Sequence, residues 1–160
     1  MNARWTLAVF LLSIMGCAPA VDKHNEITAS RVPQEFGQFK RRESPNDYLV
    51  CPADYCRNAT PDRLSPQLPI SAANLRIRLD ILLAKEPRTR IIFDNGANLV
   101  IEQRSAIFRF PDFIDVELID LGPTKSTLAI FSRSKYGYYD FGANKRRIDA
   151  WLRELVSSPK

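Results

Sequence analysis

The chain has 160 residues, of which 45% are hydrophobic and 26% are charged, a composition typical of one globular domain rather than a disordered chain. Its 23 Lys and Arg exceed its 18 Asp and Glu, giving a net charge of +5 that suits acidic partners. The single histidine, His24, and the count of three cysteines argue against a histidine-based catalytic triad, a multi-histidine zinc site and a disulfide-built miniprotein.

The amino-terminal residues have the pattern of an export signal. One positive charge, Arg4, precedes an apolar stretch from Thr6 to Met15, which is too short for a membrane span, since a spanning helix needs roughly 20 apolar residues. The stretch ends in Ile14-Met15-Gly16-Cys17, which resembles the bacterial lipobox, where an aliphatic residue and a small residue precede a lipid-bearing cysteine. We therefore expect a lipoprotein signal peptide over residues 1–16 and lipidation of Cys17.

An ordinary secretory signal, cut after Ala18 or Ala20, is the alternative. By resemblance to the sorting rule for lipoproteins, the non-acidic Ala18 indicates the outer membrane, so the predicted location is the bacterial cell envelope, lipid-anchored and facing the periplasm. Residues 17–45 are rich in polar residues and lack sustained periodicity, which predicts a flexible tether. A single globular domain is then expected over residues 46–157.

Two cysteines remain once Cys17 is assigned to lipid. Cys51 and Cys56 are close in the chain, and a secreted compartment is oxidising, so we expect them to form a disulfide worth about 2 kcal/mol. A redox-active site is the weaker interpretation, because four residues separate the cysteines and no strand-helix pattern surrounds them. Residues 46–70 also carry four prolines and are expected to be ordered loop with little regular structure.

Helical periodicity occurs twice. Ser71 is a candidate N-cap for a helix over 72–86 that ends at Pro87 and carries Leu75, Leu79, Leu82 and Leu83 at helical spacing. A second helix is expected over about 144–156. Its apolar positions are Ile148, Trp151, Leu152 and Leu155.

The residues between these helices are typical of strands joined by tight turns. Strands are expected over 90–94, 99–104, 113–120 and 126–132, and the first pair is joined by Asn95-Gly96. The strand over 113–120 alternates an aliphatic face with a mostly polar face that carries Phe113 and Ile119. The predicted fold is α+β, with an antiparallel sheet of about four to five strands and two main helices packed on one face.

The loop joining the last strand to the last helix is dense in polar and aromatic residues. Its candidate functional residues are Ser132, Arg133, Ser134, Lys135, Tyr136, Asp140, Asn144, Arg146 and Arg147. Asn144 is a candidate N-cap, so Lys145, Arg146 and Arg147 fall in the first helical turn, where the helix dipole disfavours cations. Either Asp140, with Asp149, pairs with these arginines, or an external anion binds the free backbone N–H groups and the guanidinium groups.

The same residues carry a family resemblance. The run Ser-x-Ser-x-x-Gly-x-x-Asp-x-Gly-x-Asn-x-x-Arg-Ile, from Ser132 to Ile148, resembles the domain-of-unknown-function family 1499, as do Phe110-Pro-Asp112 and Pro45-Asn46 before the cysteine pair. The similarity covers about residues 44–157. It implies an envelope domain and no reaction. Lys135 departs from the family, where many relatives have Arg, and this weakens a bidentate contact at that position.

The function expected from these features is a lipid-anchored binding or envelope-maintenance module that uses the basic and aromatic loop at 132–147. Its partners would be the membrane, through the anchor, and an anionic envelope component or an envelope protein. The alternatives are an envelope hydrolase with a Ser, Lys and Asp site that lacks histidine, and a purely structural lipoprotein. No cofactor, metal or nucleic acid is expected, the last because of export.

Overall fold

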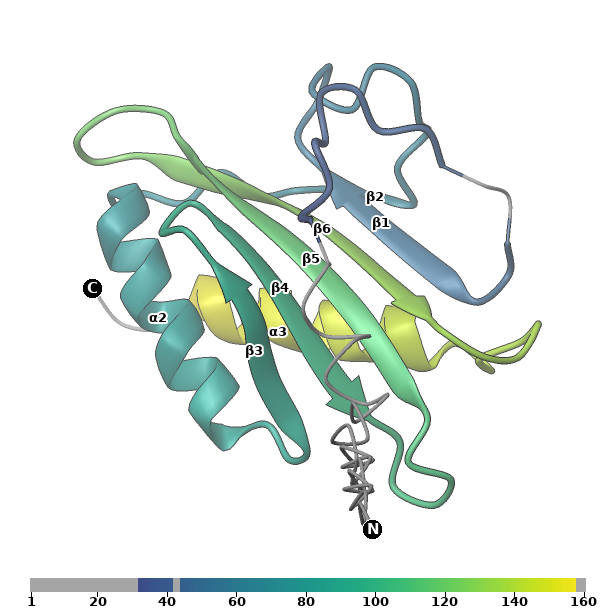
Figure 1. Cartoon of the computed structure of the whole chain (residues 1–160). Coiled ribbons are helices and arrows are strands. Elements are labelled where there is room, and N and C mark those ends of the chain that lie inside the picture. Colours follow the sequence, from purple (N-terminus) through teal and green to yellow (C-terminus); the bar gives the residue numbers. More distant parts are fainter. Residues whose placement is uncertain (1–31, 42–43, 158–160) are drawn as a thin grey trace, which may run out of the picture.

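The computed structural model of the chain describes residues 32–41 and 44–157, so the predicted signal peptide and Cys17 lie outside the described residues. The described elements are β1 (Asp47–Cys51), β2 (Arg63–Leu64), α2 (Ala72–Lys85), β3 (Thr89–Asp94), β4 (Asn98–Arg104), β5 (Pro111–Asp120), β6 (Ser126–Ser134) and α3 (Ala143–Ser157). Within these residues the strands form one sheet in the order β2-β1-β6-β5-β4-β3, and α2 and α3 pack on one face of it (Figure 1).

Both helices form where apolar periodicity predicts them. The Ser71 side chain accepts a hydrogen bond from the Asn74 backbone N–H (3.2 Å), which confirms Ser71 as the N-cap of α2. The apolar positions of both helices are buried in one core with the aliphatic faces of β4, β5 and β6. Burial of these side chains supplies most of the helical stability, because isolated helices of this length are marginal in water.

The predicted α+β class is confirmed, but the sheet is larger than expected and mixed. β1 and β2 lie in residues 46–70, where the sequence predicted irregular structure, and they pair in parallel, whereas all other neighbouring strands are antiparallel. β1 is almost wholly buried on both faces, so its sequence shows no alternation of apolar and polar residues. Its position next to β6 is a tertiary contact that local patterns do not encode.

A second, smaller core covers the sheet face opposite the helices. Phe36 and Phe39 pack there on Leu49 and Phe131, together with the predicted disulfide, which is present between Cys51 and Cys56 with a Cα–Cα distance of 6.2 Å. The face of β5 that carries Phe113 and Ile119 is mostly polar, as predicted, but it is covered rather than open to solvent: Phe113 and Asp115 are buried. Phe36 and Phe39, which lie in the expected tether before residue 46, dock on the sheet and belong to the folded domain.

None of the helices in the described residues combines the length and the apolar content that crossing a bilayer requires.

Candidate functional site

The segment that the sequence singled out divides at the end of β6. Strand alternation turns Ser132 towards the helices and Arg133 towards the opposite face of the sheet. After Ser134 the chain leaves the sheet as a loop, and it returns at Ala143 as α3. The candidate residues consequently belong to three different environments: a buried network, a pocket and an exposed loop.

Asn144 is the centre of the buried network. Its side-chain oxygen accepts hydrogen bonds from the Ser132 hydroxyl (2.6 Å) and from Arg147 (2.9 Å). Its side-chain amide donates to the backbone oxygen of Asn46 (2.8 Å) and to Asp140 (2.8 Å), with a longer bond to the Ser134 hydroxyl (3.2 Å). Asn144 is fully buried, and its bonds connect β6, α3 and the chain before β1.

Arg147 extends the network to β5. It donates to the Asp112 carboxylate at 2.5 Å, and both side chains are largely buried. The same guanidinium donates to the hydroxyl of Ser132 at 3.2 Å. A buried, hydrogen-bonded ion pair of this kind holds the start of α3 against the start of β5, and removing one partner would leave the other charge uncompensated.

The N-cap prediction for Asn144 is wrong, because Asn144 lies inside α3. Asp140 caps the helix instead: its carboxylate accepts from the backbone N–H groups of Gly142 (2.8 Å) and Asn144 (2.7 Å). The expected pairing of Asp140 with the arginines is also not observed, since Arg147 pairs with Asp112. Two of the backbone donors that an external anion would use are occupied by Asp140, so the anion-binding interpretation loses support at this helix end.

The exposed part of the segment is aromatic. Tyr136, Tyr138, Tyr139 and Phe141 are each at least half exposed, and Lys135 lies 5.2 Å from the centre of the Tyr136 ring. Arg146 is exposed and donates to the backbone oxygen of Phe141 (2.6 Å). These side chains do not contribute to either core, so they are available to a partner.

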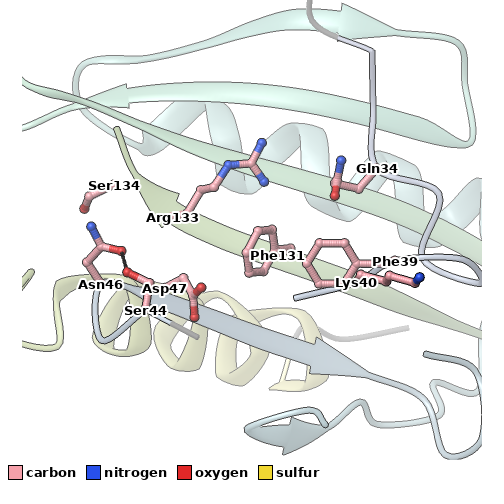
Figure 2. Close-up of a pocket in the computed structure, with 9 residues that line it drawn as sticks. All are labelled: Gln34, Phe39, Lys40, Ser44, Asn46, Asp47, Phe131, Arg133 and Ser134. Atoms are coloured by element: carbon pink, nitrogen blue, oxygen red, sulfur yellow. Dashed lines mark hydrogen bonds between the residues drawn. The ribbon is translucent and has the colours of Figure 1, made fainter. Parts of the chain in front are cut away.

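Arg133 and Ser134 line a pocket of about 450 Å³ on the sheet face opposite the helices (Figure 2). Its other lining residues are Gln34, Phe39, Lys40, Ser44, Asn46, Asp47 and Phe131. The Arg133 guanidinium lies 5.0 Å from the centre of the Phe131 ring and 3.2 Å from the carboxylate of Asp115, which is fully buried below it. Ring and carboxylate together fix the orientation of the guanidinium at the pocket wall.

The pocket's own carboxylate, Asp47, is bound by Arg41. Two nitrogens of Arg41 donate to it at 3.0 and 2.5 Å, and Arg41 also pairs with Asp62 at 2.7 Å. Burial raises the pKa of Asp47, and the opposing hydrogen bond from Arg41 does not fully offset this effect. The negative charge of Asp47 is thus balanced by Arg41, within the protein, before any ligand binds.

A further polar cluster, centred on Asp149, joins α3 to β1 and β2. Asp149 accepts from Arg63 (2.7 Å), from Lys145 (2.8 Å) and from the Tyr48 hydroxyl (3.2 Å). Burial alone would raise the pKa of Asp149, but the hydrogen bonds from Lys145 and Arg63 outweigh it and the pKa is lowered. Asp149 thus neutralises Lys145, one of the cations that the helix dipole disfavours.

Some functional residues escaped the sequence analysis. Phe39 and Asp47 of the pocket, and Arg41 beside it, come from the segment expected to be tether or loop, where no periodicity marks them. Asn46 appeared only in the family resemblance, although its backbone and side chain link Ser134, Gly137 and Asn144. Such links join positions about 90 residues apart, so no local pattern reveals them.

The arrangement gives little support to the hydrolase alternative. The Ser132 hydroxyl is fully buried and hydrogen-bonded to Asn144, and Asp140 is engaged at the helix end. Neither side chain therefore reaches a substrate as a nucleophile or a base. Within residues 32–41 and 44–157, no cluster of three or more His, Cys, Asp or Glu side chains is placed to hold a metal ion.

Fold and site together define a small α+β domain in which a polar network fixes the last helix and a pocket and an aromatic loop remain accessible. Residues 24–155 match the profile of the family described as "Protein of unknown function (DUF1499)", and the chain belongs to this family. No curated protein and no solved structure matches the chain.

Proposed function

We propose that this protein is a lipid-anchored module of the bacterial cell envelope that binds an acidic group of an envelope component in the pocket beside Arg133. The anchoring rests on the lipobox-like residues before Cys17 and on the disulfide, which fits an oxidising compartment. The attachment, the envelope location and the ligand are parts of one proposal and are tested separately.

One observation carries the choice of ligand. The Arg133 side chain is 29% exposed and is held between the Phe131 ring and the buried Asp115 carboxylate, with its orientation set before a ligand arrives. A guanidinium in such a setting favours a carboxylate or a phosphate, because its N–H groups match the geometry of these anions. The aromatic wall of Phe39 and Phe131, whose ring centres are 4.6 Å apart, suits an adjoining apolar part of the ligand.

Binding is favoured over catalysis for a related reason. The candidate nucleophile Ser132 and the candidate acid or base Asp140 are engaged in the hydrogen bonds that hold α3. Ser132 and Asp140 are therefore not accessible as a catalytic pair, whereas Ser134, the other candidate nucleophile, lines the pocket and accepts a hydrogen bond from Asn144 (3.2 Å). A purely structural lipoprotein would leave the pocket and the aromatic loop without a role, so a binding module accounts for more of the surface.

The ligand proposal is tested by calorimetric titration with soluble cell-wall fragments that end in carboxylates. We expect heat of binding with the free carboxylates and none with the same fragments after amidation of those groups. Arg133→Gln should weaken binding by about tenfold or more, the effect of losing one hydrogen bond to a charged group. Arg57→Gln, at an exposed position directly after the disulfide loop, is the matched control.

Because Arg133 also contacts buried Asp115, the stability of each variant is measured by thermal unfolding, and Lys40→Gln provides a second pocket variant at an exposed position. Equal affinity for amidated and free fragments would refute the proposal that the pocket binds the carboxylate. The anchor is examined by metabolic labelling with radioactive palmitate: the label should enter the protein and disappear in Cys17→Ala.

A further inference from the structure

Four arginines gather where β3 begins and β4 ends. Arg88, Arg90, Arg104 and Arg109 line a pocket of about 300 Å³ with Thr89 and Glu102. The Glu102 carboxylate is buried and accepts from Arg90 (3.1 Å) and from Arg104 (2.7 Å). A single carboxylate among these lining residues leaves the pocket positive, which favours an acidic group from outside.

The backbone holds this cluster in place. The Arg88 side chain donates to the backbone oxygen of Arg104 (3.0 Å), and the backbone N–H of Arg104 donates to the backbone oxygen of Arg88 (3.0 Å). Arg88 and Arg109 both have positive φ angles, 58° and 57°, which are unusual for residues other than glycine. The chain thus turns sharply on both sides of the pocket and brings arginines from separate segments together.

An exposed apolar loop borders the arginine pocket. In the loop between β4 and β5, Ile107 is 83% exposed and Phe108 is 71% exposed, and the rings of Phe108 and Phe110 stack with centres 5.5 Å apart. Phe110 also contacts Tyr136 of the loop after β6, with ring centres 5.6 Å apart. Both loops lie at the same end of the sheet (Figure 1). We call this surface the aromatic end. Its members are Ile107, Phe108, Phe110, Tyr136, Tyr138, Tyr139 and Phe141.

We propose that the aromatic end docks on an anionic lipid bilayer, with the arginine pocket binding lipid phosphates and the aromatic side chains entering the interfacial layer. Aromatic rings favour the boundary between headgroups and acyl chains, and guanidinium groups bind phosphate in a forked geometry. The two features lie side by side, and the apolar side chains project from loops rather than lining a groove. This arrangement fits a deformable lipid bilayer better than a protein partner of complementary shape.

The inference rests on the proposed anchoring to the extent that a membrane must be near. Residues 17–31, at about 3.3–3.6 Å each, span at most about 54 Å from Cys17 to the first described residue. Val32 lies beside Asn95, Asn98 and Glu117, at the end of β4 opposite the aromatic end, and the 7 residues of β4 span about 23 Å at ~3.3 Å each. The tether is longer than this offset, so a bilayer that holds Cys17 is within reach of the aromatic end. Tethering would raise the local concentration of the surface at the bilayer and make even weak docking effective.

The test uses the full chain reconstituted in vesicles of phosphatidylcholine and phosphatidylglycerol, with Phe108→Trp as a fluorescent probe. The matched control is Ile77→Trp on α2, which is 56% exposed and lies with Pro123 and Thr124 at the opposite end of the sheet. Emission is compared with the parent chain, which contains Trp151 and, only where the signal peptide is retained, Trp5. Lipids with brominated acyl chains should quench the added emission of the Phe108→Trp variant and leave that of the Ile77→Trp variant unchanged.

The arginine pocket is tested in the same assay. Each of Arg88→Gln and Arg109→Gln should lower the docked fraction relative to the undocked fraction about fivefold, the change expected from one cation near an anionic surface. Pure phosphatidylcholine vesicles should give a similarly weakened signal.

Several results would overturn the docking proposal. The first is equal quenching of the two introduced tryptophans. The second is quenching that stays the same when either arginine is replaced and when the lipid charge is removed. The proposal of the lipid anchor and the proposal of the docking surface can be refuted independently of each other. Palmitate labelling without quenching of the Phe108→Trp variant refutes docking, and quenching without labelling refutes only the anchor.

Discussion

The start of α3 and the loop before it lie next to each other in the chain, yet their polar and aromatic residues have opposite surroundings. Asn144 and Arg147 are buried and hydrogen-bonded to residues of β5 and β6. Tyr138 and Phe141, a few residues earlier, are 68% and 89% exposed. This comparison shows that one dense run of polar and aromatic residues can contain a buried part that stabilises the fold and an exposed part that is available to a partner.

The largest expected effect separates two adjacent arginines. Arg147→Gln removes the partner of the largely buried Asp112 and should lower the free energy of unfolding by about 3 kcal/mol. Arg146→Gln should change it by less than about 0.5 kcal/mol, because Arg146 is exposed. Chemical denaturation of both variants measures the difference, and equal losses would contradict the division between buried and exposed cations.

Truncation of the network's central residue comes next. Asn144→Ala leaves buried groups without hydrogen-bond partners, among them the backbone oxygen of Asn46, and should cost about 2 kcal/mol. Asn74→Ala is the control, because Asn74 is an exposed residue early in α2, where alanine is the better helix former. If both variants unfold at the same urea concentration as the parent, the network has no stabilising role.

The cap of α3 should contribute less. Asp140→Ala loses the hydrogen bonds from the backbone N–H groups of Gly142 and Asn144 and from the Asn144 side-chain amide, which keeps its bond to Asn46, and should cost about 1 kcal/mol. Asp140→Asn keeps one oxygen acceptor but replaces the other with an NH2 group that faces an N–H donor, so it should recover only about half of that loss. Thermal unfolding monitored by circular dichroism distinguishes the two, and an equally unstable asparagine variant would show that charge rather than capping matters here.

A smaller effect depends on pH. Asp149 has a lowered pKa in the folded state because of Lys145 and Arg63, so its contribution is present above the unfolded pKa of about 3.9 and is lost as the pH falls through the folded value. The stability advantage of the parent chain over Asp149→Asn should therefore shrink below about pH 4. Denaturation at about pH 7 and about pH 3 measures it, and a pH-independent difference would contradict this linkage.

The smallest effect on stability is expected in the loop itself. Phe141→Ser and Tyr138→Ser should each leave the free energy of unfolding within about 0.5 kcal/mol of the parent, since both side chains are mainly exposed. Hydrogen exchange of α3 should likewise stay unchanged. A loss above about 1 kcal/mol from either substitution would place the loop with the network and weaken the comparison.

The part of the fold that the sequence predicts is the part with strong periodicity. Both helices and the strands from β3 to β6 were located to within a few residues, because leucines at helical spacing and alternating strands are local signals. β1 and the packing of Phe36 and Phe39 were missed. Those residues are fixed by contact with β6, whose position depends on the whole sheet.

The sequence predicts which residues belong to the candidate site but not how they are placed relative to one another. Ser132, Asn144 and Arg147 were named as functional, whereas the structure makes them parts of a buried network. No local sequence pattern predicts the arginine pocket. Arg88 and Arg109 belong to different turns of the sheet, and each alone is an ordinary surface charge.

The sequence by itself determined the α+β class, the two amphipathic helices, the cysteine pairing and the family, since each depends on residue types at short spacing. The tertiary structure decided which polar side chains are buried and which cations remain accessible. The physical reason is that burial and hydrogen-bond partners come from segments far apart in the chain, and only the completed sheet brings Asp112 to Arg147 or Asp115 to Arg133.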